Sequence, residues 1–248
     1  TVIENTRSLR SVFPEIGTVN GLTHRSFIAG EVSGDLETNF GFTHKALTKI
    51  KPEVLATAIL ELRYISSAAY FKSGGLEIRN SAWYIKAVEE MKETIVREYD
   101  SFYFESIVNF FRKHGRVVDE GATCLVNGDM TPWNFYINCL LVGEGKDFIV
   151  ADWNSLHFNN PGFDLAGIYV FAWKNSVWRE SFLSSFKAMW QDDQEKLAVF
   201  IKYCQAFHCV SAIKLVHHAM EKELNSEAKV NAESLLKNSR DLLKMIIL

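Results

Sequence analysis

Three side chains that could support phosphoryl transfer stand beside short apolar segments of the chain. Asp129 follows the segment CLV at 124–126 with two residues between them. Asn134 directly precedes FYINCLLV at 135–142, and Asp152 directly follows DFIVA at 147–151. A carboxylate and an amide oxygen presented together are suitable ligands for Mg²⁺. A second carboxylate nearby can orient and deprotonate a hydroxyl nucleophile. Together the three residues provide parts that a phosphoryl-transfer site needs.

These side chains can act together only if the segments that carry them form strands. The segments 123–129, 135–142 and 147–153 have the composition of short strands, and GEGK at 143–146 joins the last two as a turn. Such a hairpin brings Asp152 back beside Asn134. A polar turn cluster without catalysis is the alternative interpretation, because loops are rich in Asp and Asn. That alternative does not explain why strands flank the three residues.

The rest of the pattern predicts a small β region followed by a mainly helical region. Asn20-Gly21 is a strong turn signal, and it predicts a hairpin between Ile16–Val19 and Ser26–Val32, with a connector at 33–42. From Pro52 onward the apolar positions recur with helical spacing. The expected helices are the end of one at 1–13, one from 52 to Gly74-Gly75, one from 82 to 113 that ends at His114-Gly115, and several from 164 onward with breaks near 174–175 and 192–193.

Composition excludes several classes of protein. The chain has 248 residues, is 48% hydrophobic and carries a net charge of -3, which suits a globular domain with an ample core. No run of about five like charges suggests a nucleic-acid surface or a membrane-binding arm. No stretch of about 18 apolar residues predicts a membrane span. The four cysteines form no C-x-x-C pair, so we interpret them as reduced core residues of a cytoplasmic protein. Oligomeric state is not encoded in any of these features.

Three motifs carry a resemblance to a known family. NGDMTPWN at 127–134, VADW at 150–153 and FDLAG at 163–167 resemble the H-G-D-x-x-x-x-N, D-[FW] and D-L-A signature of the aminoglycoside phosphotransferase and choline kinase family. The resemblance implies an α+β, protein-kinase-like fold. Residues 1–33 would be the remnant of a small nucleotide-binding lobe with the hinge. Residues 34–248 would form a large, mainly helical lobe with a short catalytic β-hairpin.

The resemblance also assigns roles to individual residues. Asp129 corresponds to the catalytic base, and Asn134 and Asp152 correspond to the magnesium ligands. Glu31 and Val32 would lie at the hinge, where backbone groups bind the adenine ring of ATP.

Two further residues would support this machinery. Asp164 matches a family carboxylate that supports the catalytic segment from within, although it could equally cap a helix that starts at Leu165. Asn127 stands where the family usually has a structural His.

Besides Asn127 in place of the usual His, the chain departs from the family pattern in the small lobe. The family's phosphate-covering glycine loop and strand Lys would precede Thr1, and Glu4 is a candidate for the helix Glu that pairs with this Lys. We therefore expect a longer natural chain, by roughly a hundred residues. The implied function is ATP- and Mg²⁺-dependent transfer of a phosphate to a hydroxyl of a small molecule, such as a sugar, an amino alcohol or an aminoglycoside-like acceptor. The alternative is a pseudokinase or binding module that lacks the lysine and the glycine loop by nature.

Overall fold

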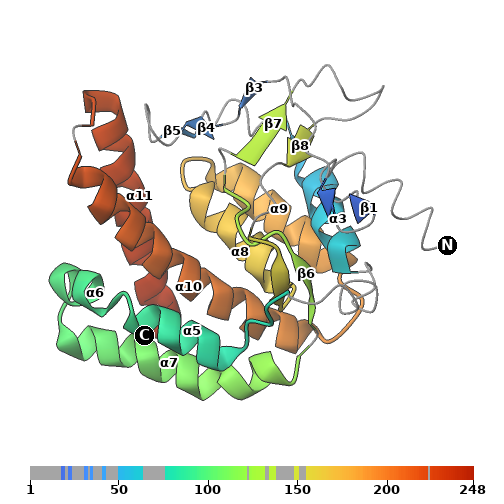
Figure 1. Cartoon of the computed structure of the whole chain (residues 1–248), viewed down its shortest axis with the longest axis horizontal. Helices are drawn as coiled ribbons and strands as arrows, with labels where there is room; N and C mark the ends of the chain where they lie inside the picture. Colours follow the sequence, from blue (N-terminus) through green and yellow to red (C-terminus); the bar gives the residue numbers. More distant parts are fainter. Residues whose placement is uncertain are drawn as a thin grey trace.

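The computed structural model describes residues 18–19, 22–23, 31–32, 34–35, 41–42, 50–63, 76–121, 123–131, 134–137, 148–150, 155–222 and 224–248. Most of this part of the chain is helical (Figure 1), and its short strands pair into four small β-sheets. The predicted helix at 1–13 and Glu4 lie outside the described residues. The helices are α3 (Pro52–Arg63), α5 (Ser81–Glu89), α6 (Lys92–Glu98), α7 (Ser101–Asp119), α8 (Gly162–Phe171), α9 (Ser176–Met189), α10 (Gln194–Met220) and α11 (Ser226–Ile247).

Helix α10 is the centre of the core. It packs against α8, α11, α7 and α6, and buried side chains lie on all its faces, among them Phe200, Cys204, Ala212 and Val216. A helix that is apolar all round belongs inside a core or a membrane. Among the described helices, α10 alone is long and apolar enough to cross a bilayer, but 72% of its most apolar window is buried within the fold. We therefore interpret it as the core helix.

The predicted helix at 82–113 is wrong in its boundaries, because the segment forms three helices. The chain breaks between α6 and α7 at Asp100, whose side chain accepts a hydrogen bond of 2.6 Å from the backbone N–H of Tyr103 and so caps α7. Gly115 lies inside α7 rather than at its end. A Cβ atom there would lie 2.8 Å from Cβ of Ser81, so this glycine permits the close approach of α5 to α7.

The other helix breaks follow the prediction more closely. Asn175 caps α9 by accepting a hydrogen bond of 3.1 Å from the N–H of Trp178, and Asp193 caps α10 in the same way. The predicted breaks near 174–175 and 192–193 are thus confirmed. The sequence missed the third break, where Asn225 caps α11. Helix α3 begins at Pro52 as expected, while residues 64–75 lie outside the described part.

The strands differ from the expected pairing in two places. Strand β1 (Thr18–Val19) pairs with β2 (Leu22–Thr23), so the chain does return on itself after Val19, but the partner is not the predicted Ser26–Val32. Of that predicted strand, the described residues Glu31–Val32 form β3, which pairs with β7 (Phe135–Ile137). The expected connector at 33–42 contains a pair of its own, β4 (Gly34–Asp35) and β5 (Gly41–Phe42).

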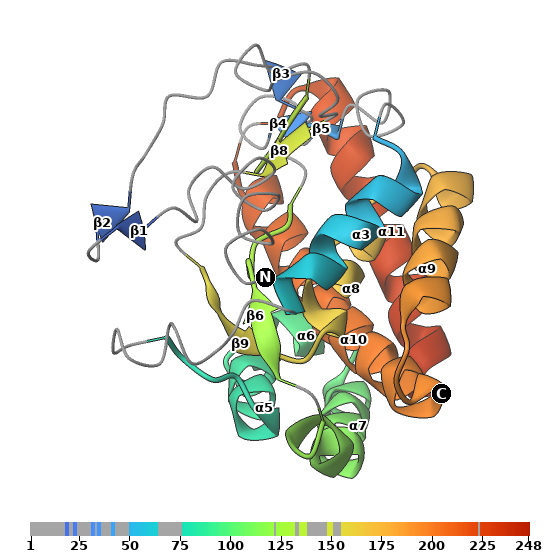
Figure 2. The same ribbon diagram turned by 90° about the vertical axis from the view of Figure 1, so that its right-hand side faces the viewer.

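Two pairings position the candidate site. Strand β7 pairs with β8 (Phe148–Val150) in antiparallel register, with Phe135 opposite Val150, which confirms that the two predicted segments pair with each other. Strand β6 (Cys124–Val126) pairs with β9 (His157–Asn159), a strand that the sequence analysis missed. In Figure 2 the β6–β9 pair lies between the β3–β7–β8 sheet and helices α5 and α7. The loop after β6 therefore emerges toward the hairpin.

Candidate active site

The loop that follows β6 is a compact turn built from its own backbone. Asn127 is fully buried, and its amide oxygen accepts a hydrogen bond of 2.9 Å from the N–H of Asp129. The N–H of Thr131 donates to the carbonyl of Asp129 at 2.7 Å, and the N–H of Asn134 donates to the carbonyl of Thr131 at 3.0 Å. Gly128 has φ +85°, a conformation that residues with a Cβ rarely adopt. The sequence N-G-D is thus matched to this turn.

Asp164 holds the loop from below. It lies in the first turn of α8, is only 1% exposed, and accepts hydrogen bonds from the N–H groups of Asn127 at 2.7 Å and Gly128 at 3.0 Å. The cap position of α8 is Pro161, so the expectation that Asp164 caps a helix starting at Leu165 is wrong. The carboxylate bonds the backbone of a distant loop instead of its own helix.

The electrostatics of Asp164 reflect this burial. Loss of solvent and, to a smaller extent, the charge of Asp129 raise the pKa of its carboxyl, the two backbone N–H donors act in the opposite direction, and the net result is a pKa of about 7. Within the described part of the chain this buried carboxyl has two N–H donors and forms no ion pair, which suits a support for backbone geometry. It cannot reach solvent, so it is no candidate for direct contact with a substrate.

Asp129 and Asn134 are brought together as the sequence analysis expected. The side-chain amide of Asn134 donates to the carboxylate of Asp129 at 3.0 Å and to its backbone carbonyl at 2.8 Å. The hydroxyl of Thr131 donates to the other carboxylate oxygen at 2.9 Å. Two donors therefore orient the carboxylate of Asp129, which is only partly buried. The amide nitrogen of Asn134 is occupied by the loop, so its amide oxygen is the atom suited to a metal ion.

The described residues contain only part of the expected metal site. Asp152 falls within 151–154, outside the described residues, although the register of β7 and β8 brings the end of β8 opposite the start of β7, directly after Asn134. In the described part, no group of three or more His, Cys, Asp or Glu side chains could hold a metal. The amide oxygen of Asn134 fits Mg²⁺, and the second ligand remains a prediction from sequence.

The expected hinge residues also come close to this site through the backbone. Glu31 pairs with Ile137 and Val32 pairs with Tyr136, so β3 is the outer strand beside the hairpin that follows Asn134. The strand assigned to the hinge is thus joined by hydrogen bonds to the strand assigned to the metal site. This arrangement is consistent with one nucleotide bound across both.

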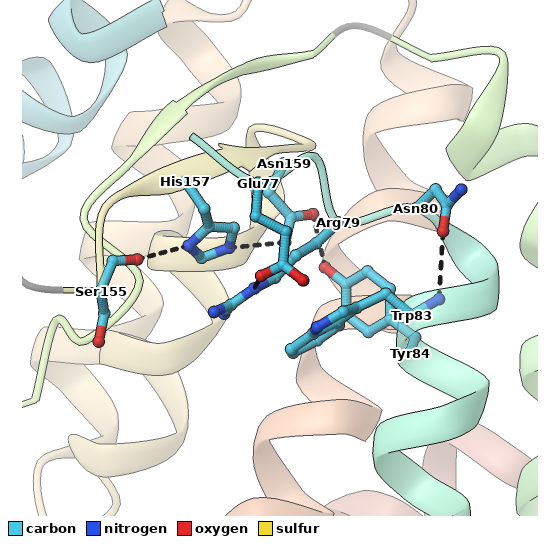
Figure 3. A network of polar contacts seen from close by, with 8 residues as sticks. All are labelled: Glu77, Arg79, Asn80, Trp83, Tyr84, Ser155, His157 and Asn159. Atoms are coloured by element: carbon cyan, nitrogen blue, oxygen red, sulfur yellow. Dashed lines mark hydrogen bonds and ion pairs between the residues drawn. The ribbon is translucent and has the colours of Figure 1, made fainter. Parts of the chain in front are cut away.

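Sequence reasoning missed a group of buried residues behind the loop. His157 and Asn159 on β9 and Tyr84 on α5 form a hydrogen-bonded chain that reaches the backbone at Ser155 (Figure 3). A Cβ atom on Gly128 would lie 2.7 Å from the ring of His157. Strand β9 has only three residues, HFN, which give no alternation by which a strand could be identified.

Comparison with known proteins supports the fold. No protein-family model and no curated protein sequence matches the chain. Among solved structures, the apoenzyme of the macrolide 2'-phosphotransferase MphH from Brachybacterium faecium is similar with a TM-score of 0.50 at 14% identity, over 94% of this chain and 78% of that one. The GDP complex of wild-type aminoglycoside 2'-phosphotransferase-IIIa gives 0.53 at 14%, over 88% and 75%.

A third structure comes from a different kind of enzyme. The Plasmodium vivax ethanolamine kinase is similar with a TM-score of 0.51 at 14% identity, over 100% of this chain and 71% of that one. The chain therefore has the protein-kinase-like fold of these small-molecule phosphotransferases, an α+β fold with a large helical lobe. The resemblance inferred from the three motifs is confirmed at the level of the fold.

Proposed function

We propose that this chain carries the catalytic lobe of an ATP- and Mg²⁺-dependent phosphotransferase that acts on a hydroxyl of a small molecule. The observation that carries the proposal is the loop after β6. Asp129 is oriented there by Thr131 and Asn134, while Asp164 fixes the backbone on the buried side. A polar turn without catalytic function has no need of a buried carboxylate that supports it.

In this proposal Asp129 is the base. The oxygen of the acceptor hydroxyl forms a bond with the γ-phosphorus, and the bond from that phosphorus to the β–γ bridging oxygen breaks, so that ADP leaves. The hydroxyl proton passes to the carboxylate of Asp129. Positioning of the hydroxyl is the larger part of such catalysis, because the transition state is loose. A carboxylate held by two donors is suited to that task, since its orientation is set before the acceptor binds.

The remaining roles concern the nucleotide. Asn134 and Asp152 would hold Mg²⁺, and the bound ion would neutralise charge on the phosphate oxygens. Backbone groups of Glu31 and Val32 would bind the adenine ring. By their names, the similar proteins phosphorylate a macrolide, an aminoglycoside or ethanolamine, and the aminoglycoside phosphotransferase structure is a GDP complex. These names support a small hydroxyl-bearing acceptor and a nucleotide, and we place the activity in the cytoplasm, away from membranes and nucleic acids.

The test compares two isosteric variants of the full-length protein. Asp129→Asn should leave the increase in melting temperature caused by MgATP almost intact, and should lower transfer to the acceptor by about 10²–10⁴-fold, the usual contribution of a general base. Asp152→Asn should lose both the thermal shift and the transfer. Exposed Asp192→Ala serves as the control and should behave as the parent.

Acceptors are taken from a panel of sugars, amino alcohols and aminoglycosides. If Asp129→Asn turns over every acceptor as fast as the parent, Asp129 is not the base. If the parent binds no nucleotide and phosphorylates no acceptor, the protein is a pseudokinase or binding module instead.

A further inference from the structure

The imidazole of His157 lies directly behind the loop that carries Asp129. The residue is 1% exposed, and its ring packs against the backbone of Gly128: a Cβ atom on that glycine would lie 2.7 Å from both Cε1 and Nδ1. The carbonyl oxygen of Ser155 lies even closer to the same point, at 2.4 Å. The ring and the carbonyl together form the wall against which the loop rests.

The hydrogen bonds of His157 fix both its tautomer and its orientation (Figure 3). A carbonyl oxygen can only accept, so Nδ1 carries the proton that is donated to Ser155 at 2.7 Å. Nε2 must then accept from the side-chain amide of Asn159, at 3.1 Å. The oxygen of that amide accepts from the hydroxyl of Tyr84 at 2.7 Å. Each donor in this chain faces an acceptor.

Burial keeps this imidazole neutral. The pKa of His157 is lowered to about 4, chiefly by loss of solvent and also by the positive charge of Arg79, while the bond to Ser155 and the charge of Glu77 act in the opposite direction. The guanidinium of Arg79 lies over the ring of Trp83, and that ring is inclined by 28° to the imidazole with centroids 6.5 Å apart. At neutral pH the ring therefore has one donor and one acceptor, as the hydrogen-bonded chain requires.

We propose that His157 is a positioning residue of the phosphotransfer site, and this inference rests on the proposed function. By holding the carbonyl of Ser155 against Gly128, the ring fixes the position of the loop that carries Asp129. A shift of about 1 Å at such a contact can cost roughly 10²-fold in rate.

Two substitutions test the hydrogen bonds of Nδ1 and Nε2 of the imidazole separately. His157→Asn places an amide nitrogen near the position of Nδ1, so the bond to Ser155 is kept and the bond to Asn159 is lost. His157→Gln reaches the position of Nε2 and does the reverse. Both variants lose stability, because each leaves a buried group without its partner. His208→Gln is the control, since His208 is a partly buried histidine that bonds the carbonyl of Phe163 and lies close to Gly167 instead of the loop.

The experiment measures two quantities on the full-length proteins. Hydrogen–deuterium exchange of peptides covering 125–131 reports the loop directly, without any activity. We expect His157→Gln to raise this exchange at least 10-fold, and His157→Asn and His208→Gln to leave it close to the parent. Turnover should follow the same order: kcat falls at least 10-fold in His157→Gln and recovers to within a few-fold in His157→Asn, while KM for MgATP changes little.

The outcomes separate this inference from the proposed function. If His157→Gln leaves loop exchange unchanged, or raises it without lowering kcat in an active enzyme, His157 is a structural core residue and the inference is wrong. If both His157 variants lose the same amount of kcat, the bond to Ser155 is not what matters, and the inference is also wrong. If the parent transfers no phosphate to any acceptor, the proposed function fails, and the exchange data then decide whether His157 positions the loop.

Discussion

Substitution of Gly128 by Ala tests the geometry of the catalytic loop at its most constrained point. The residue has φ +85°, which costs a residue with a Cβ about 1–2 kcal/mol. The new methyl group would also lie 2.4 Å from the carbonyl oxygen of Ser155 and 2.7 Å from the ring of His157. Overpacking of this kind costs about 1–3 kcal/mol, because a backbone carbonyl cannot rotate away as a flexible side chain does. The sum is a loss of roughly 2–5 kcal/mol in the free energy of unfolding.

The same change should move Asp129, the base in our proposal. Gly128 directly precedes Asp129, and its N–H donates to Asp164, so relief of the clash displaces the loop from its support. We expect kcat of the full-length enzyme to fall by about 10–10²-fold, as for a misplacement of up to about 1 Å. Urea unfolding followed by tryptophan fluorescence measures the stability, and turnover is measured at a temperature at which every variant is folded.

Gly115→Ala is the control for a clash remote from the site. Its methyl group would lie 2.8 Å from Cβ of Ser81, so crowding should again cost about 1–3 kcal/mol, less up to about 1 kcal/mol regained from the better helix propensity of Ala. Because this clash lies between α5 and α7 and not in the loop that carries Asp129, turnover of the folded enzyme should fall much less than in Gly128→Ala. The reasoning is refuted if Gly128→Ala unfolds within about 0.5 kcal/mol of the parent, a change typical of ordinary surface positions, or if the two variants lose kcat equally.

Two further predictions concern stability alone. Burial lowers the pKa of His208 to about 4 from an ordinary value near 6.5. Between these two pH values the imidazole is protonated in the unfolded chain but stays neutral in the folded protein. The free energy of unfolding therefore decreases as the pH falls from about 6.5 to 4. Between pH 7.5 and 5, urea titrations should show that the parent loses about 2 kcal/mol more than His208→Gln. An equal loss in both proteins would contradict the lowered pKa of His208. Asp100→Ala removes the cap of α7 and should lower stability by about 0.5–2 kcal/mol, whereas Asp100→Asn, which can still accept from Tyr103, should cost less; equal effects would show that the cap is not what Asp100 contributes.

The sequence predicted the parts of the site that depend on local pattern. The antiparallel pairing of β7 with β8 follows from two apolar segments with a predicted turn between them, although a turn at 143–146 would give a different register. The bonds from Thr131 and Asn134 to Asp129 lie within one short loop. The role of Asp164 could not be decided in the same way. A carboxylate at the start of a helix can bond its own helix or another segment, and only the tertiary structure shows that it bonds Asn127.

Other features were missed because the local signal was ambiguous. Apolar spacing continues without interruption from α5 through α7, so the break at Asp100 had to be identified from a single capping residue. Glycine is typical of a helix end, but in the structure Gly115 lies inside α7, where α5 packs closely against it. His157 gave no signal, because its importance comes entirely from its contact with Gly128 across a pair of strands that are far apart in sequence.

The central position of α10 has a consequence for the order in which the protein can fold during synthesis. Helices α5, α7 and α8 all pack on α10, which follows every one of them along the chain. While the ribosome is still adding residues before Gln194, the faces of these helices that pack on α10 lack that partner, although α5 and α7 can already pack on each other. Chains stopped at this stage expose hydrophobic surface and are prone to aggregate. Slow translation after α8 would therefore be harmful, and a chaperone that holds the nascent chain until α10 emerges would raise the yield of folded protein.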